Sequence, residues 1–303
     1  MIMMNNEIEE IKKLKAFFEP TGVAIIGASH TPGKIGYQIA ENFVKKKEKG
    51  VFSGEIYLIN PRGGKILGYK VYKSILDVKE KIDHVVIAVP AKVVPDVLED
   101  CGKKGVEAVV IISAGFSETG NFEAEEKLKK IAKKYGMRVI GPNCLGIYSA
   151  YSGVDHLFLP EYKTTTDGRF LLNAPRPKAG YITLLTQSGA FGVAALDYMA
   201  GSGIGVSKFV SYGNRVDVDE ATLIEYLVED ETTRVIMLYT EGVANGRKFL
   251  KVVREATLRK PILVFKAGRT KAGARAVASH TAALAGSDQI YDAVFKQSGC
   301  VRA

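Results

Sequence analysis

Short runs of apolar, largely β-branched residues alternate along the chain with longer charged stretches in which apolar residues recur at helical spacing. The first five apolar runs cover residues 23–28, 55–60, 84–89, 108–113 and 138–140. Strands this apolar are typical of a parallel sheet that helices cover on both faces. The first half of the chain is therefore predicted to be an α/β domain.

Strand-like runs resume at residues 181–186, 208–211, 235–239 and 261–265. They follow a polar, proline-containing segment at 155–177, which we interpret as a linker. This predicts a first domain at 1–154 and a second α/β domain at 155–303, and 303 residues suffice for two cores. Residues 299–303 look like the start of one more strand.

The first 19 residues mix Glu and Lys around Ile8, Ile11, Leu14 and Phe17, which predicts an amphipathic surface helix. They lack the apolar centre of a signal peptide, and no run reaches the ~18 apolar residues of a membrane-spanning helix. The three cysteines show no metal-ligand spacing and are odd in number. We expect a soluble, cytoplasmic protein with reduced thiols and no membrane partner.

The chain carries 42 Lys and Arg against 33 Asp and Glu, a net charge of +9 that favours anionic partners. Much of the excess lies in the runs at 45–49 and 127–134, which are typical of solvated helix faces. Basic and aromatic residues do not interleave, so nucleic acid is not expected as a partner. The functional positive charge is assigned to a small set: Lys34, Arg62, Arg269 and Lys271.

A glycine-rich turn follows the first predicted strand and opens a helix, with Gly27, Gly33, Lys34 and Gly36 in it. Its glycines let backbone N–H groups approach a phosphate, and the helix dipole and Lys34 add positive charge. The spacing matches neither GxGxxG nor GxxxxGK[ST], so neither a dinucleotide fingerprint nor a P-loop is present. A plain glycine-rich turn is the alternative.

After the second strand an NAD site has an acidic residue for the ribose, whereas this chain has Asn60, Pro61 and Arg62. Arg62 and Lys65 suit a phosphate better, although a solvated basic loop would look the same. An NAD-dependent dehydrogenase is accordingly disfavoured. Tight binding of NADH would reverse that judgement.

The third, fourth and fifth strands end in small or polar residues at 89–90, 113–118 and 141–146. With the turns above, this series resembles the CoA-binding domain of the nucleoside-diphosphate-forming acyl-CoA synthetases, the superfamily of the succinyl-CoA synthetase α subunit and the archaeal ADP-forming acetyl-CoA synthetases. The resemblance runs from about Phe18 to the last residue. It implies an α/β chain with a Rossmann-like CoA-binding domain and then a flavodoxin-like domain. The CoA-binding residues it implies are Ser29, Gly33, Lys34, Asn60, Arg62, where the family often has Lys, Val89, Pro90, Ser113, Ala114 and Gly115.

Three strand ends of the second domain carry candidate chemistry. Ser188 is a good helix N-cap, and with Gly189 it leaves backbone N–H groups for a small anion. Glu241 follows the third strand of this domain, and a small, basic stretch after the fourth contains His280. An imidazole is a good phosphoryl acceptor, and a carboxylate fixes its tautomer. A plain turn, a solvated glutamate and a structural histidine are the alternatives.

The resemblance implies a phosphohistidine at His280, oriented by Glu241, with Ser188 and Gly189 gripping the phosphate. It implies an acid–thiol ligase that converts acyl-CoA, phosphate and ADP, or GDP, into a carboxylic acid, CoA and ATP. It also implies an ATP-grasp β subunit that carries the nucleotide and Mg²⁺, in an α2β2 or similar assembly; no metal site is assigned to this chain. His30, His84 and His156 are left as structural or ligand-adjacent.

A CoA- or nucleotide-binding regulatory protein without catalysis is the main alternative, but it leaves His280 and Glu241 unexplained. The archaeal α chains usually continue into another small domain, whereas the succinyl-CoA synthetase α subunit ends at about this length. The sequence therefore leaves open whether the chain is part of a longer subunit. Acyl specificity and the choice of ADP or GDP also stay open.

Overall fold

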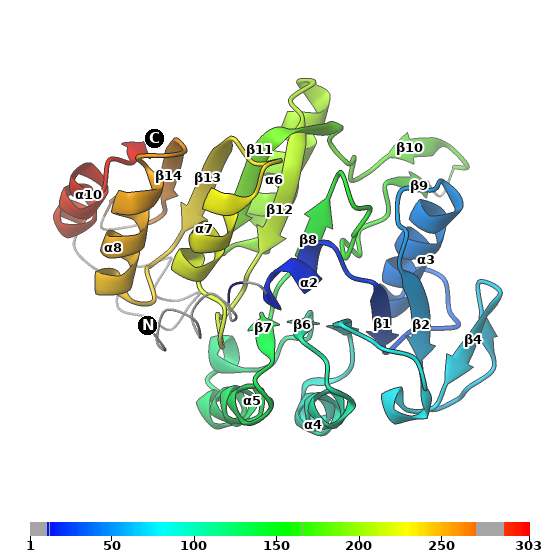
Figure 1. Cartoon of the computed structure of the whole chain (residues 1–303). Helices are drawn as coiled ribbons and strands as arrows, with labels where there is room; N and C mark the ends of the chain where they lie inside the picture. Colours follow the sequence, from blue (N-terminus) through cyan, green and yellow to red (C-terminus); the bar gives the residue numbers. More distant parts are fainter. Residues whose placement is uncertain (1–10, 12, 166, 271–287) are drawn as a thin grey trace.

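The computed structural model describes residues 11, 13–165, 167–270 and 288–303, and they form two largely parallel sheets with helices around them (Figure 1). The first sheet has the order β3-β4-β2-β1-β5-β6-β7, in which only β3 runs antiparallel to its neighbour. Its strands are β1 (Gly22–Ile26), β2 (Glu55–Ile59), β3 (Lys65–Ile66), β4 (Tyr69–Tyr72), β5 (His84–Ile87), β6 (Ala108–Ile111) and β7 (Arg138–Ile140).

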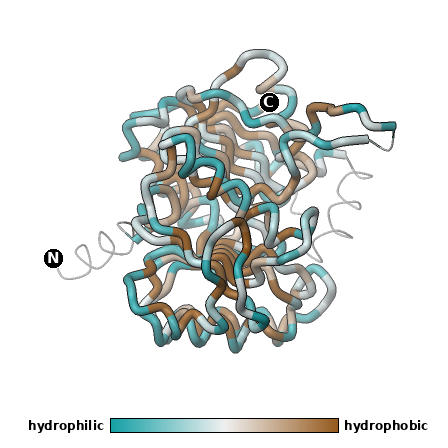
Figure 2. Tube along the Cα trace, turned by 90° about the vertical axis from the view of Figure 1, so that its right-hand side faces the viewer, coloured by the Kyte–Doolittle hydropathy of each residue, from teal (hydrophilic) through white to brown (hydrophobic). Residues whose placement is uncertain are grey.

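Helices cover both faces of this sheet, as the apolar strands predict. Alternate residues of β1 show the two faces: Ile25 packs in the cluster of α3 (Ile35–Glu48), and Ile26 in that of α4 (Val94–Lys104) and α5 (Phe122–Tyr135). Gly105 and Gly136 end α4 and α5 in the left-handed conformation. Apolar segments accordingly fill the interior of the molecule in Figure 2.

The second sheet has the order β15-β14-β13-β11-β12-β8. Its strands are β8 (Gly146–Ser149), β11 (Ala179–Thr186), β12 (Val206–Ser211), β13 (Val235–Thr240), β14 (Ile262–Lys266) and β15 (Val301–Arg302). Its helices are α6 (Gly189–Gly201), α7 (Glu220–Glu229), α8 (Gly246–Ala256) and α10 (Asp288–Gln297). The five parallel strands have the flavodoxin-like order, so the predicted fold class is confirmed, and β15 is the expected last strand.

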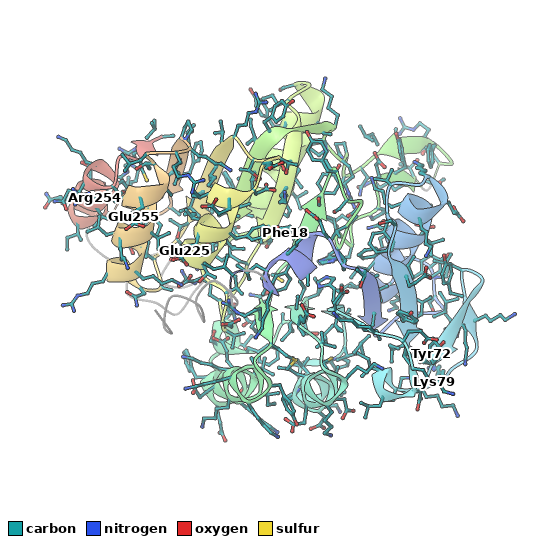
Figure 3. The ribbon with its side chains drawn as sticks, viewed as in Figure 1. Phe18, Tyr72, Lys79, Glu225, Arg254 and Glu255 are labelled. Carbon is teal, nitrogen blue, oxygen red and sulfur yellow. The ribbon has the colours of Figure 1, made fainter. Side chains whose placement is uncertain are left out.

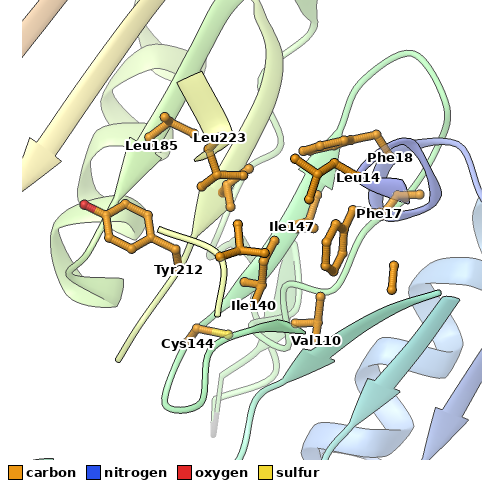
Figure 4. Packing of buried hydrophobic residues seen from close by; sticks show 14 of the residues in the cluster. Leu14, Phe17, Phe18, Val110, Ile140, Cys144, Ile147, Leu185, Tyr212 and Leu223 are labelled. Atoms are coloured by element: carbon orange, nitrogen blue, oxygen red, sulfur yellow. The ribbon is translucent and has the colours of Figure 1, made fainter. Parts of the chain in front are cut away.

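The structure differs from the sequence predictions in three places. The short helix α2 (Lys15–Phe18) is not a surface element, because Phe17 and Phe18 are wholly buried between the two sheets (Figures 3 and 4). Strand β8 lies before the predicted boundary at 154/155 but pairs antiparallel with β12 of the second sheet. The division at that boundary itself stays a prediction.

The third difference is the segment 155–177, which is not an exposed linker. Asp155 and Arg176 form a salt bridge of 2.9 Å with both side chains almost fully buried. Arg176 also donates to backbone carbonyls within the segment, and Asn42 of α3 donates to the carbonyl of Leu157 at 2.8 Å. The middle of the segment forms an antiparallel hairpin of β9 (Tyr162–Thr164) and β10 (Phe170–Leu172).

Backbone contacts between residues 214–218 and 139–143 fix the two sheets relative to each other. The N–H groups of Asn214, Val216 and Val218 donate to the carbonyls of Pro142, Gly141 and Val139. Asp217 accepts from the Arg138 guanidinium and from the Val139 N–H, both at 2.9 Å. A shared apolar cluster that includes Val110, Ile140, Ile147 and Tyr212 continues across the junction (Figure 4).

Among the helices in the described part of the chain, none combines the length and the apolarity that crossing a membrane requires.

Two buried histidines also link the sheets. The Nε2 atoms of His84 on β5 and His156 lie 3.1 Å apart, and the rings stack. His156 Nδ1 accepts from the Ile147 N–H, so its proton must sit on Nε2 and point to His84. His84 then carries its proton on Nδ1 and donates it to the Ala108 carbonyl. Both rings are therefore neutral and fully hydrogen-bonded. Their role is structural, which is one of the two roles that the sequence left open.

This pair should make the fold sensitive to mild acid. Burial lowers the pKa of His84 from 6.5 to about 4 and that of His156 well below 6.5, while nearby Asp83 opposes the change at His84. Below pH 6.5 these two histidines therefore bind protons in the unfolded chain but not in the folded chain. Stability should fall by about 1 kcal/mol per pH unit for each histidine between pH 6.5 and 5.

Urea unfolding at pH 7.5 and 5.5 measures this loss. Replacing His156 alone, and then both histidines, by Gln should flatten the pH dependence, whereas Gln at the exposed His30 should leave it unchanged. An equal slope in wild type and the double variant would assign the acid sensitivity to other groups.

The turn between β1 and α3 depends on close contacts of two glycines. Gly27 has a φ of +96°, and a methyl group there would lie 2.3 Å from the Ala88 carbonyl oxygen. A methyl group on Gly36, in the first turn of α3, would lie 2.0 Å from the Gly27 carbonyl oxygen. The helix thus begins directly against the end of the strand, and only glycine permits that approach.

Gly36→Ala should consequently destabilise the fold by at least about 2 kcal/mol, because the backbone at Gly36 and the backbone at Gly27 must move apart. Gly201→Ala is the matched control, since that glycine ends α6 with nothing within 4 Å of the added methyl group. It should leave the free energy of unfolding unchanged or raise it slightly. Equal effects of the two substitutions in urea unfolding would contradict the close-contact explanation.

Candidate functional site

The first half of the site is a cavity of about 780 Å³ at the carboxyl ends of β1, β2 and β5. Strand order reverses between β1 and β5, and open α/β sheets bind ligands at such a switch point. The cavity has the size of a cofactor site. Six of the residues predicted to contact CoA line it: Ser29, Lys34, Asn60, Arg62, Val89 and Pro90.

Side chains of two loops hold this cavity in shape. Asn60 donates from Nδ2 to the Ala28 carbonyl at 2.8 Å and accepts the Arg62 N–H at its Oδ1 at 2.9 Å. The His30 ring contacts the Gly63 carbonyl at 3.0 Å. Asn60 and His30 therefore join the loops after β1 and β2, and the exposed Arg62 is placed at the rim.

The start of α3 gives the cavity its anion-binding character. Lys34 precedes the helix without a side-chain cap, so the N–H groups of Ile35 and Gly36 stay available to a ligand. Ile35 and Gly36 line the cavity. The positive end of the helix dipole thus faces the space beside Lys34.

A second cavity of about 600 Å³ adjoins the first and shares Val89 and Pro90 with it. Ser113 and Ala114, predicted for CoA, line it, as do Ser188 and Gly189, predicted for phosphate. The two sets, which are far apart in sequence, therefore meet around one space. Gly33 and Gly115 line neither cavity; Gly115 instead donates its N–H to Glu118 at 2.5 Å.

The side of this second cavity that belongs to the second sheet is the beginning of α6. Ser188 caps the helix by accepting the Phe191 N–H at 3.3 Å. The strand order of the second sheet reverses between β11 and β13, so Ser188 after β11 and Glu241 after β13 lie at the same switch point. Glu241 is only 8% exposed, so it is not a solvated surface glutamate.

Gln187 connects the two strand ends, and sequence reasoning did not select it. Its Oε1 accepts the Glu241 N–H at 3.0 Å, and it lines the second cavity beside Ser188. Because Oε1 is held in this way, the amide group Nε2 is oriented and offers N–H donors. Its position directly before the predicted N-cap was the only available signal in the sequence.

A buried ion pair positions the loop that contains Glu241. Glu220 is wholly buried and accepts the Ala244 N–H at 2.9 Å. Arg215 pairs with Glu220 at 3.3 Å and also donates to the Gly242 carbonyl. Ala244 is thus held by α7, and Gly242 is held by the loop before α7. Neither Arg215 nor Glu220 stands in a motif that would have marked it.

Lys266 ends β14 directly beside Thr240 of β13. Burial lowers its pKa, while Asp288 and Glu241 act in the opposite direction. Its ammonium group lies 4.5 Å from the centre of the Tyr291 ring. A buried cation therefore stands next to the strand end that carries Glu241.

His280, with Ser279 and Thr281, lies outside the described residues, as does Lys271, and Arg269 is exposed. Within the described ranges no cluster of three His, Cys, Asp or Glu side chains is arranged to hold a metal ion. The arrangement that is described can bind an extended anionic ligand in the first cavity. It can also bind a small anion at the start of α6, beside a buried carboxylate.

Two family models match this chain, one in each half. Residues 21–150 match the model of a CoA binding domain, and residues 179–303 match that of a succinyl-CoA ligase like flavodoxin domain. The α subunit of acetate–CoA ligase (ADP-forming) I of Pyrococcus furiosus is 47% identical over 96% of the chain, which spans 60% of that subunit. An acetate–CoA ligase (ADP-forming) of Methanocaldococcus jannaschii is also 47% identical over 96% of the chain, which spans 38% of it.

A solved structure of a Candidatus Korarchaeum cryptofilum acetyl-coenzyme A synthetase, in complex with phosphate and ADP, is similar with a TM-score of 0.86. Its sequence is 42% identical, and the match covers 96% of this chain and 59% of that one. The chain thus spans less than two thirds of each of these relatives. It belongs to the nucleoside-diphosphate-forming acyl-CoA synthetase superfamily, with a CoA-binding domain and a succinyl-CoA ligase-like flavodoxin domain.

Proposed function

We propose that the chain is the CoA-binding and phosphoryl-transferring part of an ADP-forming acyl-CoA synthetase, an acid–thiol ligase. The observation that carries this proposal is the shared space between the two domains. Val89 and Pro90 line the first cavity and the second, and Ser188 and Gly189 line the second. A thioester held in the first cavity would therefore reach a phosphate held at the start of α6.

CoA binds in the first cavity with its phosphates at Lys34, Arg62 and the start of α3. The loops that contain Ser29, Gly33 and Asn60 shape this end of the site. The pantetheine arm passes Val89 and Pro90 and ends near Ser113, Ala114 and Gly115. The apolar lining there suits the arm, and the N–H groups of the helix start suit the phosphates.

The reaction then follows from the order of the groups along the cavities. A phosphate oxygen attacks the thioester carbonyl, the C–S bond breaks, and CoA leaves as the thiol with an acyl phosphate formed. An imidazole nitrogen of His280 attacks phosphorus and the carboxylate departs. The N–H groups of Ser188 and Gly189 stabilise the phosphoryl oxygens, and Glu241 orients the imidazole and stabilises its positive charge.

The phosphohistidine passes the phosphoryl group to ADP on an ATP-grasp β subunit that holds Mg²⁺, and the reverse sequence makes acyl-CoA. One finding supports a partner subunit. The Pyrococcus furiosus relative is named an α subunit, and an α subunit has a partner. An α2β2 assembly is the stoichiometry we propose.

Calorimetry tests whether the first cavity binds CoA. CoA should bind to the chain, and NADH should bind far more weakly, because Asn60 stands where a ribose-binding carboxylate would be needed. Arg62→Ala should weaken CoA binding about tenfold through loss of one charged phosphate contact.

Lys79→Ala removes the same charge from an exposed side chain that does not line the cavity (labelled in Figure 3), and it should leave CoA affinity unchanged. Binding of NADH in preference to CoA, or equal effects of the two variants, would contradict the assignment of this cavity to CoA.

Phosphoryl transfer is tested with the chain, its β subunit, Mg²⁺ and ATP labelled at the γ-phosphate. The chain should acquire an acid-labile label, and His280→Ala should abolish it. Glu241→Gln should slow labelling by about a hundredfold, because the neutral amide cannot stabilise the imidazolium.

Glu255→Gln is the matched control, since Glu255 is an exposed glutamate on the outside of α8 (Figure 3). It should label like the wild type. Undiminished labelling of His280→Ala, or no labelling of the wild type, would overturn the phosphohistidine mechanism and favour a CoA-binding regulator.

A further inference from the structure

The second cavity also carries information about the acid. We infer that Leu145 is the wall of this cavity that limits how far the acyl group can reach. The inference rests on the proposed function, since it assumes that thioester and phosphate meet in this cavity. It names what that function leaves open, the residue that selects among acids by their length.

The acyl group has only one place to lie if both reaction partners are bound. Its carbonyl carbon must be within bonding reach of the CoA sulfur and of the attacking phosphate. The second cavity is lined on one side by Pro90 and Ser113 and on the other by Ser188 and Gly189. The remainder of the acyl group must therefore extend along the walls that neither CoA nor phosphate uses.

Those remaining walls are mostly apolar. Ile112, Cys144, Leu145, Phe158 and Ala190 supply them, beside the side-chain amides of Asn143 and Gln187, and none of the described lining residues carries a charge. Burial also raises the pKa of the Cys144 thiol to about 12, so this wall is neutral. The walls that thioester and phosphate leave free therefore suit the hydrocarbon part of an acyl group.

Leu145 separates this cavity from a smaller apolar pocket behind it. The small pocket has about 10 Å³ of free space, room for about one water molecule. Leu145 lines both spaces, whereas Leu157, Val193 and Leu196 line only the small pocket. Arg176 is also on its wall, but Asp155 already neutralises that guanidinium.

Local packing keeps Leu145 in this position. Its backbone N–H donates to the Ser211 hydroxyl at 3.1 Å, and its side chain is only 8% exposed. The side chain lies against Gly189, where an added methyl group would be 3.1 Å from Leu145 Cγ. It therefore closes the cavity directly beside the start of α6, and shortening it would join the two spaces.

The test compares acids on the chain assembled with its β subunit. The readout is the ratio of kcat/KM for hexanoate to that for acetate, because a ratio within one variant cancels any general loss of activity. Leu145→Ala should raise this ratio at least about tenfold, the effect expected for added room for a few methylene groups. Leu145→Val should give an intermediate value.

Leu157→Ala is the matched control, because it removes the same atoms from the small pocket without opening it to the second cavity. It should leave the ratio unchanged, and thermal unfolding shows that both variants fold. An unchanged ratio in Leu145→Ala, or an equal change in Leu157→Ala, would overturn the inference. Wild-type labelling from ATP with acetate turnover would then leave the proposed function standing, whereas absence of both would reject that function first.

Discussion

The contact between residues 214–218 and 139–143 is the constraint on which the rest of the site depends. Each sheet has its own switch point, and neither alone contains both a large cavity and a small-anion site. Three backbone hydrogen bonds and the Asp217 carboxylate join the end of β7 to the loop after β12. Because backbone groups make these bonds, the two switch points face each other at a fixed spacing.

The polar contacts at this junction set geometry more than they add stability. Asn214 donates to Ser117, Glu118 and Glu125, so the loop after β6 is held by the second domain. Burial disfavours the charge on Glu118, but hydrogen bonds from Gly115, Asn214 and Phe116 lower its pKa overall. A half-buried polar network that is satisfied in one arrangement disfavours others that would leave its members unpaired. The loop that carries Ser113 and Ala114 of the second cavity is therefore fixed by contacts from both domains.

The rim of each sheet could be predicted from the sequence because a strand end is a local feature. An apolar run followed by a small or polar residue marks the position of Ser188 or Asn60 without knowledge of the fold. The antiparallel strand β8, the buried segment around Asp155 and the links made by Gln187, Arg215 and Glu220 all need partners distant in the chain. No period or motif encodes such pairings, so those features required the structure.

The distribution of charge explains why a net charge of +9 says little about the chemistry. Lys34 and Arg62 lie at the first cavity, where a ligand must be captured from water, whereas the described lining of the second cavity has no charged residue. The partial charges of the N–H groups at the start of α6 replace full cations there. In the proposed reaction, a phosphoryl group held by such dipoles would be bound less tightly than by a lysine or arginine, and weaker binding suits a group that must be passed on.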